Sequence, residues 1–169
     1  MVRITLNIYV TTGVGEASTS LGAFDSALFQ AGIGNYNLVV LSSVIPVAAT
    51  VLRKQWHAED DQWGHKLYVV VAEQRVDRPG QEAWAGLGWV QNEEDGRGLF
   101  VEHHGHSRQQ VEDDIGASLA SMCAYRTTSF GAPQMAVVGT SCTGLPACAM
   151  AAAVYQSRGW NASVFGEGE

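Results

Sequence analysis

Two adjacent serines, Ser42 and Ser43, offer the most unusual chemistry in this sequence. They end the apolar part of the stretch "GIGNYNLVVLSSVIP", which occupies residues 32–46. A serine hydroxyl can attack the carbonyl carbon of the residue before it and convert that peptide bond into an ester. Elimination from the ester then breaks the chain and leaves dehydroalanine, which hydrolyses to a pyruvoyl group. The serine pair could therefore act as a self-cleavage site.

That reaction makes two demands on the surrounding backbone. A planar trans peptide holds the hydroxyl in a poor position for attack, so the backbone must be strained. Hydrogen-bond donors must also face the carbonyl oxygen as it becomes an oxyanion. Asn35 and Asn37 are close enough in sequence to provide an amide donor, and the glycine-rich turn can offer backbone N–H groups. The stretch thus contains the parts that self-cleavage requires.

An ordinary structural interpretation of the same stretch is also open. Gly32 or Gly34 could end a helix with a positive φ angle. Asparagines tolerate tight turns, and serines commonly end strands. A phosphate-binding loop would need the order strand, glycines, helix, but the pattern here is helix, glycines, strand. We exclude the phosphate loop, and from the residues alone the ordinary interpretation is favoured over self-cleavage.

The first part of the chain predicts a strand, a loop and a helix. Alternation of apolar and polar residues predicts a half-buried strand, and its apolar members are Val2, Ile4, Leu6, Ile8 and Val10. Residues 11–20 are expected to form a Gly/Ser/Thr loop with a helix cap at Ser18 or Ser20. Helical spacing of Leu21, Phe24 and Leu28 then predicts a helix that ends near Gly32.

The rest of the chain predicts several strands and a second helix. The helix is capped by Ser107, and its apolar positions are Val111, Ile115, Leu119 and Met122. Strands are expected over residues 37–41, 47–52, 66–76, 82–92, 98–104 and 134–142. Residues 53–65 are polar and read as a surface excursion. Residues 147–156 are ambiguous, because their alanines favour a helix while their position suits a strand. We expect one domain over residues 1–169, an α+β fold of sheets flanked by helices.

Composition excludes several classes of function. The net charge of −7 argues against a nucleic-acid partner, because phosphate binding needs clustered Lys and Arg. Three cysteines without CxxC spacing make a disulfide framework or a structural zinc site improbable. The sequence contains no unbroken apolar stretch of the ~18 residues that a membrane helix needs. Its first ten residues alternate, unlike a signal peptide. The expected location is cytoplasmic, with no membrane partner.

Residues 23–46, "AFDSALFQAGIGNYNLVVLSSVIP", resemble the self-cleaving region of the pyruvoyl-dependent arginine decarboxylases. The pattern of that family is roughly A-F-D-x-A-L-x-x-A-G-I-G-N-x-N-L followed by S-S-I-x-P. Two later segments, "GLFVEHHG" (98–105) and "CAMAAAVYQ" (148–156), resemble family segments at compatible distances. The resemblance therefore covers most of the chain.

The resemblance implies cleavage between Ser42 and Ser43. Residues 1–42 would form a small β subunit, and residues 43–169 a large α subunit whose first residue, Ser43, becomes the pyruvoyl cofactor. It also implies a layered αββα sandwich, as in the pyruvoyl-dependent histidine and arginine decarboxylases. Family members usually form homotrimers with active sites between subunits, so a trimer of cleaved αβ units is expected.

The resemblance further implies the reaction and the roles of individual residues. The pyruvoyl group would form a Schiff base with L-arginine and accept the electron pair released with CO2, so that agmatine forms. Glu102 would be the general acid, and Asp25 would bind the substrate's guanidinium. Asn37 would assist cleavage and orient the pyruvoyl group, whereas Asn35 would stabilise the turn. Ser42 would contact the region of the substrate's carboxylate. Physiologically, the activity could serve polyamine biosynthesis or acid consumption.

The sequence departs from the family pattern directly after Glu102. Its run "EHHGHS" brings together His103, His104 and His106. Strand alternation puts His103 on one face and His104 with His106 on the other, and two histidines make a poor metal site without a third ligand. We therefore expect no metal, and exposed histidines at a strand end.

Two alternatives to an arginine decarboxylase remain open. The first is an uncleaved trimeric homologue with a binding or structural role, and the second is a decarboxylase of another amino acid. A hydrolase that uses a metal at "EHHGH" is a less favoured possibility.

Overall fold

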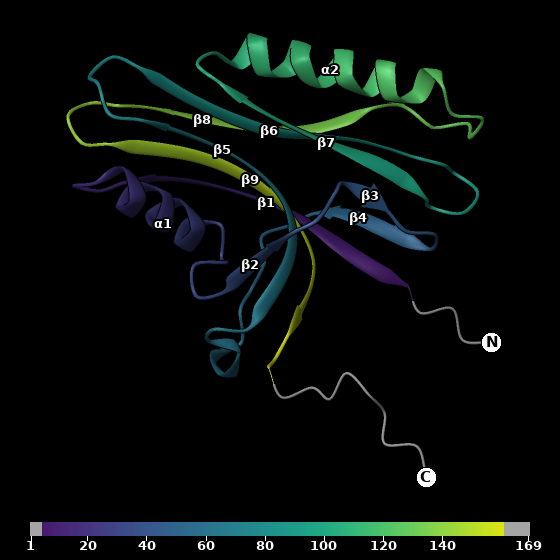
Figure 1. Cartoon of the computed structure of the whole chain (residues 1–169), viewed down its shortest axis with the longest axis horizontal. Helices are drawn as coiled ribbons and strands as arrows, with labels where there is room; N and C mark the ends of the chain where they lie inside the picture. The colour runs from purple at the N-terminus through teal and green to yellow at the C-terminus, as the bar shows by residue number, and fades with distance from the viewer. Residues whose placement is uncertain (1–4, 161–169) are drawn as a thin grey trace.

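The computed structural model describes residues 5–160, which form four layers (Figure 1). Helix α1 (Ser20–Gln30) covers one sheet and helix α2 (Arg108–Ala124) covers the other. The first sheet contains β2 (Asn37–Val40), β5 (Lys66–Val76), β9 (Ala147–Arg158), β1 (Leu6–Glu16) and β4 (Ala49–Arg53), in that order. The second contains β3 (Val44–Ile45), β7 (Gly98–Gly105), β6 (Glu82–Gln91) and β8 (Gln134–Ser141). The expected αββα sandwich is confirmed.

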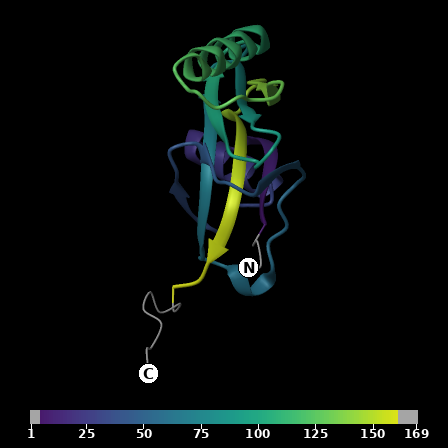
Figure 2. The ribbon, with the colours of Figure 1, turned by 90° about the vertical axis from the view of Figure 1, so that its right-hand side faces the viewer.

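Each pair of neighbouring layers encloses its own apolar core. The core between the two sheets includes the fully buried side chains of Trp89 and Phe100. A second core joins α1 to the five-stranded sheet, and a third joins α2 to the four-stranded sheet. Burial of apolar area in these three interfaces is the main force that holds the layers together. Figure 2 shows α2 across the top of this arrangement, with β9 extending away from it.

Strand β1 is longer than the sequence predicts. Residues 11–16 continue the strand and pair with β9 as far as Glu16 opposite Ala147, so the predicted loop there is wrong. Gly13 and Gly15 misled the prediction because their function is packing rather than turning. A Cβ atom on Gly13 would lie 2.2 Å from the carbonyl oxygen of Ala27, so only glycine allows α1 to approach this closely. Val2 and Ile4 of the predicted strand lie outside the described residues.

The N-cap of helix α1 lies one residue away from each of the two predicted caps, Ser18 and Ser20. This N-cap is Thr19, whose side chain accepts a hydrogen bond of 3.0 Å from the backbone N–H of Gly22. The predicted end near Gly32 is confirmed, since α1 ends at Gln30 and Gly32 has a φ angle of 82°. Glycine is required there, because a Cβ would lie 2.0 Å from the carbonyl oxygen of Trp56.

The ambiguous alanine-rich segment forms β9, a strand in the middle of the five-stranded sheet. It pairs with β5 on one side and β1 on the other. Its odd-numbered residues from Ala147 to Tyr155 face the other sheet, and its even-numbered residues from Cys148 to Val154 face α1. A strand covered on both faces has no polar side, so it loses the alternation that identifies a strand.

Most of the remaining elements follow the prediction closely, but β3 has no predicted counterpart and β4 begins two residues later than the strand predicted over residues 47–52. Strands β5, β6, β7 and β8 lie where the sequence places them, and the side chain of Ser107 caps α2 by accepting from Gln110 N–H. Beyond β4, the polar segment up to residue 65 contains one short 3₁₀ turn, Asp60–Gln62, as the surface prediction expects. Within residues 5–160 no helix has both the length and the apolar character needed to cross a bilayer.

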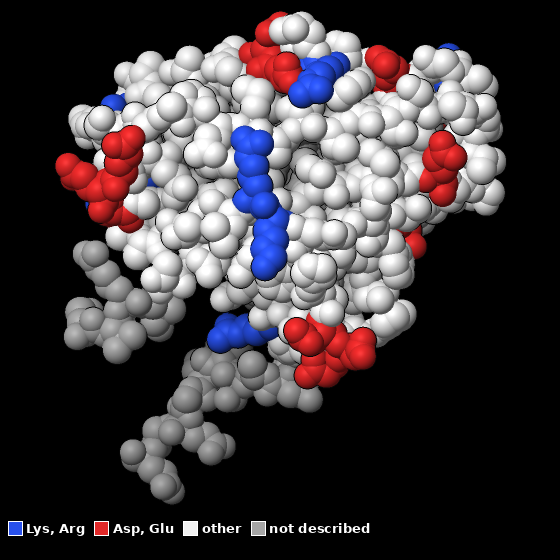
Figure 3. Space-filling model, turned by 180° about the vertical axis from the view of Figure 1, so that it is seen from behind, with Lys and Arg blue, Asp and Glu red and all other residues white. Residues whose placement is uncertain are grey.

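Charged side chains are sparse on the face opposite the view of Figure 1. Figure 3 shows a few Lys and Arg side chains near its middle and acidic side chains towards its edges. This distribution agrees with a charged fraction of only 16%. On this face the basic side chains form only a short group near the middle.

Candidate active site

The Ser42–Ser43 peptide bond lies where the chain crosses from one sheet to the other. On its N-terminal side, the backbone N–H of Leu41 donates to the carbonyl oxygen of Val69 in β5 at 2.8 Å. On its C-terminal side, the N–H of Phe100 in β7 donates to the carbonyl oxygen of Ser43, also at 2.8 Å. The peptide bond is therefore suspended between two anchored segments that belong to different sheets.

The backbone of Ser43 is in the left-handed region, with a φ angle of 67°. Only Ser43 and Ala48 combine a side chain with a positive φ angle within the described part of the chain. For a residue with a Cβ atom, this conformation costs roughly 1–2 kcal/mol. The strain that self-cleavage requires is thus present at the serine that would attack.

The hydroxyl of Ser43 is held by the carboxylate of Glu102. Its Oγ atom lies 2.9 Å from Oε1 and 2.8 Å from Oε2 of Glu102. The two residues meet because Glu102 follows Phe100 by two positions in β7, so both side chains leave the strand on the face toward the other sheet. Ser43 is only 8% exposed, whereas Glu102 is exposed. The hydroxyl therefore lies beneath a proton acceptor that a small molecule can reach.

Tyr155 completes the surroundings of the serine, and no sequence pattern predicted a role for it. Its phenolic O–H, on β9, donates to the carbonyl oxygen of Val44 at 2.9 Å. Its ring packs edge-on against Phe100 with a centroid distance of 6.3 Å. Burial raises the pKa of Tyr155, and the nearby negative charge of Glu102 raises it further. The one signal in the sequence is a single aromatic residue after a run of small ones.

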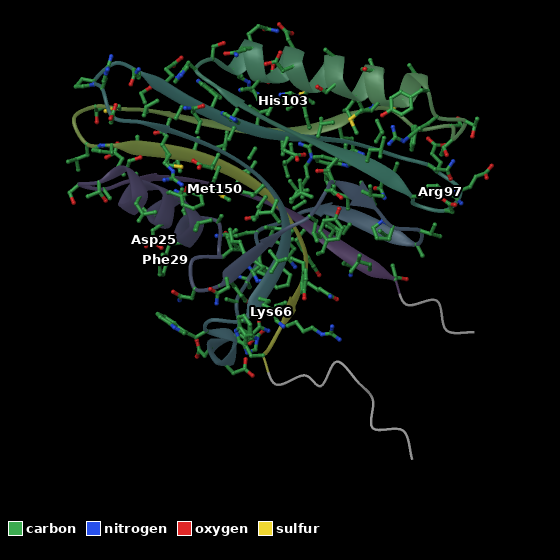
Figure 4. The ribbon with its side chains drawn as sticks, in the orientation of Figure 1. Asp25, Phe29, Lys66, Arg97, His103 and Met150 are labelled. Carbon is green, nitrogen blue, oxygen red and sulfur yellow. The ribbon has the colours of Figure 1, made fainter. Side chains whose placement is uncertain are left out.

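The structure places Asp25 and Asn37 away from the Ser43–Glu102 pair. Asp25 is exposed on α1 (Figure 4), on the outer side of the five-stranded sheet. The side-chain amide of Asn37 donates to the carbonyl oxygen of Gly64 at 2.7 Å, at the end of β2 remote from Ser43. In residues 5–160 of one chain, neither side chain hydrogen-bonds to Ser43 or Glu102. The predicted site residues therefore fall into two groups.

Asn35 and Asn37 both bind the backbone at Gly64. The carbonyl oxygen of Asn35 accepts a hydrogen bond of 2.7 Å from Gly64 N–H, while Asn37 binds the Gly64 carbonyl. Gly64 itself has a φ angle of 76°. The two asparagines thus fix the turn before β2 against the turn before β5.

The three histidines after Glu102 have separate partners. His103 Nε2 lies 2.7 Å from Ser118 Oγ under α2 (Figure 4), and His104 Nδ1 lies 2.8 Å from Gln74 Oε1 in the other sheet. The opposite faces expected for these two are confirmed. His106 Nδ1 lies 3.0 Å from the carbonyl oxygen of Glu82. His104 and His106 are exposed as expected, but His103 is half-buried. No group of three metal-binding side chains forms among the described residues.

Comparison with known proteins identifies a matching family. A sequence model described as "Pyruvoyl-dependent arginine decarboxylase (PvlArgDC)" matches residues 7–158. A pyruvoyl-dependent arginine decarboxylase from Thermococcus kodakarensis is 31% identical over 147 residues, which cover 86% of this chain and 92% of the relative. The enzyme of that name from Pyrococcus furiosus is 32% identical over 141 residues, 82% of this chain and 87% of the relative. That from Halobacterium salinarum is 43% identical over 96 residues, 56% of this chain and 58% of the relative.

Proposed function

Because the chain belongs to the pyruvoyl-dependent arginine decarboxylase family, we propose that it cleaves itself between Ser42 and Ser43 and converts L-arginine to agmatine and CO2. One observation carries the proposal for this chain. A serine with a φ angle of 67° has its hydroxyl on a carboxylate, at the peptide bond that crosses between the sheets. The strained backbone, the nucleophilic hydroxyl and the proton acceptor are therefore brought together at the Ser42–Ser43 peptide bond.

The self-cleavage we propose needs only water in addition to the chain. Ser43 Oγ attacks the carbonyl carbon of Ser42, so a C–O ester bond forms, the C–N bond breaks and the hydroxyl proton ends on the nitrogen. Loss of the Cα proton of residue 43 then breaks its Cβ–Oγ bond and releases Ser42 as a carboxylate. Water hydrolyses the remaining enamine, ammonia leaves, and a pyruvoyl group begins the fragment 43–169. Glu102 is positioned to accept the hydroxyl proton in the first step.

The residues around Ser43 fit a pyruvoyl group. A pyruvoyl group supplies an electron-withdrawing carbonyl that captures the α-amine of an amino acid and makes loss of CO2 easier. Phe100 N–H fixes the carbonyl of residue 43, and Glu102 lies beside its Cβ position. We assign Glu102 the role of general acid, which delivers a proton to the carbon that loses CO2. Ser42, as a new C-terminus, would lie close to the substrate's carboxylate region.

Binding of the substrate's side chain is assigned to Asp25. A carboxylate can hold a guanidinium with two parallel charge-assisted hydrogen bonds. Asp25 and Asn37 do not meet Ser43 within one chain. We therefore propose that, in a homotrimer, one copy supplies Asp25 and Asn37 and its neighbour supplies Ser43 and Glu102 to a shared site. Exposed apolar side chains flank both groups, and association would bury them. They are Val40 and Val44 beside Ser43, and Leu21 and Phe29 on α1.

The decisive experiment combines denaturing electrophoresis with product analysis. Purified protein is expected to give fragments 1–42 and 43–169, with a mass at the new N-terminus that matches a pyruvoyl group. The Ser43→Ala variant, which lacks the nucleophile, is expected to remain one intact chain without activity. Incubation with a panel of amino acids should yield agmatine from arginine. An intact wild-type chain, or a product from another amino acid alone, would contradict the proposal.

Assembly and location are separate predictions. Sedimentation analysis should give three copies per particle, and cell fractionation should recover the protein with the cytoplasm. A contribution to polyamine synthesis would require that agmatine formed here be consumed by a further enzyme.

A further inference from the structure

Tyr155 joins the five-stranded sheet to the backbone that follows Ser43. It begins in β9, crosses the core between the sheets and donates its O–H to the carbonyl oxygen of Val44 in β3. Strand β3 contains only Val44 and Ile45, which pair with Leu99 and Gly98 of β7. So short a strand is held by few hydrogen bonds of its own, and the bond from Tyr155 is a large part of its attachment.

The backbone of β9 is irregular at the residue that makes this contact. Gln156 pairs with Tyr68 and Val154 pairs with Val69, so Tyr155 has no partner in β5. Such a bulge increases the local twist and changes the direction of a side chain, and bulges are common beside active sites. The same Val69 accepts the hydrogen bond from Leu41 just before the serine pair. The irregularity thus lies beside the segment that carries the Ser42–Ser43 bond.

The phenol is suited to act as a permanent donor. Tyr155 is 8% exposed and belongs to the core between the sheets. Burial raises its pKa and the charge of Glu102 raises it further, so the hydroxyl keeps its proton well into the alkaline range. A hydrogen bond in so dry a site is also less exposed to competition from water.

We propose that Tyr155 is a positioning residue for self-cleavage, and that with Phe100 N–H it clamps the carbonyl groups of residues 43 and 44. This inference rests on the proposed function and adds the groups that hold the reacting residue. Fixing these two carbonyls orients the two peptide planes that contain them, 43–44 and 44–45. It therefore limits the backbone rotation by which Ser43 could leave its strained conformation at φ 67°.

The clamp acts on both covalent steps of self-cleavage. In the first, Ser43 Oγ forms a bond to the Ser42 carbonyl carbon as the C–N bond breaks, and a fixed Ser43 keeps the two reacting atoms together. In the second, the Cα proton of residue 43 leaves and the Cβ–Oγ bond breaks. Electron density at that Cα spreads into the carbonyl of residue 43, whose oxygen accepts the Phe100 N–H bond. A held donor there stabilises the developing negative charge.

The clamp also has a function after the chain is cut. Residue 43 then becomes the free end of the large fragment, attached through the two-residue strand β3. Terminal segments fray unless other groups hold them. The bonds from Phe100 N–H to the carbonyl oxygen of residue 43 and from Tyr155 to that of Val44 keep this new end at a fixed distance from Glu102. Loss of the phenol hydroxyl should therefore lower kcat more than it raises KM, because substrate contacts made by Asp25 are untouched.

The test compares cleavage rates of Tyr155→Phe and Tyr68→Phe. Each variant loses one hydroxyl from a tyrosine that packs against the same core, and both keep the ring. Precursor is purified in denaturant and refolded, and fragments are followed on denaturing gels. Tyr155→Phe should cleave about tenfold more slowly than wild type, as expected for loss of one well-placed hydrogen bond. Tyr68→Phe should stay within about twofold of wild type.

A third variant separates positioning from stability. Val76→Ala removes buried methyl groups from the same core at the far end of β5, so it lowers the melting temperature without touching residues 43–44. All rates are measured below the lowest melting temperature. If Tyr155→Phe cleaves at the wild-type rate, or if Val76→Ala slows cleavage equally, the clamp is refuted while the proposed function stands. If wild type itself does not cleave, the proposed function fails first.

Discussion

Ser43 and Ala48 share one unusual backbone conformation in very different surroundings. Their φ angles are 67° and 63°, and no other non-glycine residue between positions 5 and 160 has a positive value. Ala48 lies in the turn between β3 and β4, where its N–H donates to the carbonyl oxygen of Asp95 at 2.7 Å. Ser43 has its hydroxyl on Glu102 and its carbonyl on Phe100 N–H. The two positions are alike in strain and unlike in what holds them.

A positive φ angle can shape a turn, as at Ala48, or can take part in a reaction, as we propose at Ser43. At Ala48 the left-handed residue lets the chain return from the four-stranded to the five-stranded sheet within a few residues. Its methyl side chain offers no nucleophile, so the strain has only a structural effect. At Ser43 the same conformation carries a hydroxyl with a proton acceptor beside it. Strain indicates a reactive site only where a reactive group and its partners are held with it.

The largest expected effect comes from exchanging the two side chains. The double variant Ser43→Ala, Ala48→Ser keeps both strained positions but moves the hydroxyl to the second. It should give no fragments, because the clamp formed by Tyr155 and Phe100 N–H acts on the carbonyls of residues 43 and 44 and not on residue 48. Intact-mass measurement would detect a cut at either position, and Ala48→Ser alone should still cleave at 42–43. A cut before residue 48 would show that strain and a hydroxyl suffice.

Glu102→Gln tests whether the partner at Ser43 acts by position or by proton transfer. The glutamine carbonyl oxygen can still hold the Ser43 hydroxyl but cannot take up its proton. Water must then accept that proton, so fragments should form about tenfold more slowly than in wild type. Turnover of arginine should fall by about 100-fold or more, because an amide is a poor proton donor. Fragment formation is followed by gel and agmatine by chromatography. Glu93→Gln, on an exposed loop, is the matched control, and equal loss in both assays of Glu102→Gln would contradict separate roles.

Ala48→Gly should give the smallest effect and confirm the structural half of the comparison. Glycine adopts a positive φ angle without steric cost, so the free energy of unfolding should rise by about 0.5–1 kcal/mol. The measurement is urea unfolding in a Ser43→Ala background, where one intact chain unfolds. Cleavage in the otherwise wild-type chain should be unchanged. A slower cleavage in Ala48→Gly would show that the two strained positions are coupled.

Sequence patterns predicted elements whose local signals agree with their surroundings. Helix α2 has a serine cap and one apolar stripe, and turn sequences separate β5, β6 and β7. The helical and the strand periods of these elements could therefore be read directly from the sequence. The errors arose where tertiary packing overrides local preference. Gly13 and Gly15 read as a loop, yet they allow helix α1 to contact β1. The alanines of β9 read as helix or strand, because both faces of that strand are covered.

The site was predictable only in part. The residues alone raised the serine pair as a possible cleavage site, and the resemblance gave Glu102 its role. The contact between Ser43 and Glu102 joins residues 59 positions apart. No local pattern predicts such a separation. Tyr155 was missed because its importance depends on a bulge in the pairing of β5 with β9. The roles of Asp25 and Asn37 stay predictions, since their relation to Ser43 depends on a second copy of the chain.

The order of strands has a consequence for the severed protein. Residues 1–42 contribute β1, which lies between β9 and β4 inside the five-stranded sheet, and β2, which pairs with β5. All three of those partners belong to residues 43–169. Strands from both fragments would thus alternate within one hydrogen-bonded sheet, and dilution alone would not separate the fragments. Native size-exclusion chromatography would therefore not distinguish the cleaved protein from the intact one.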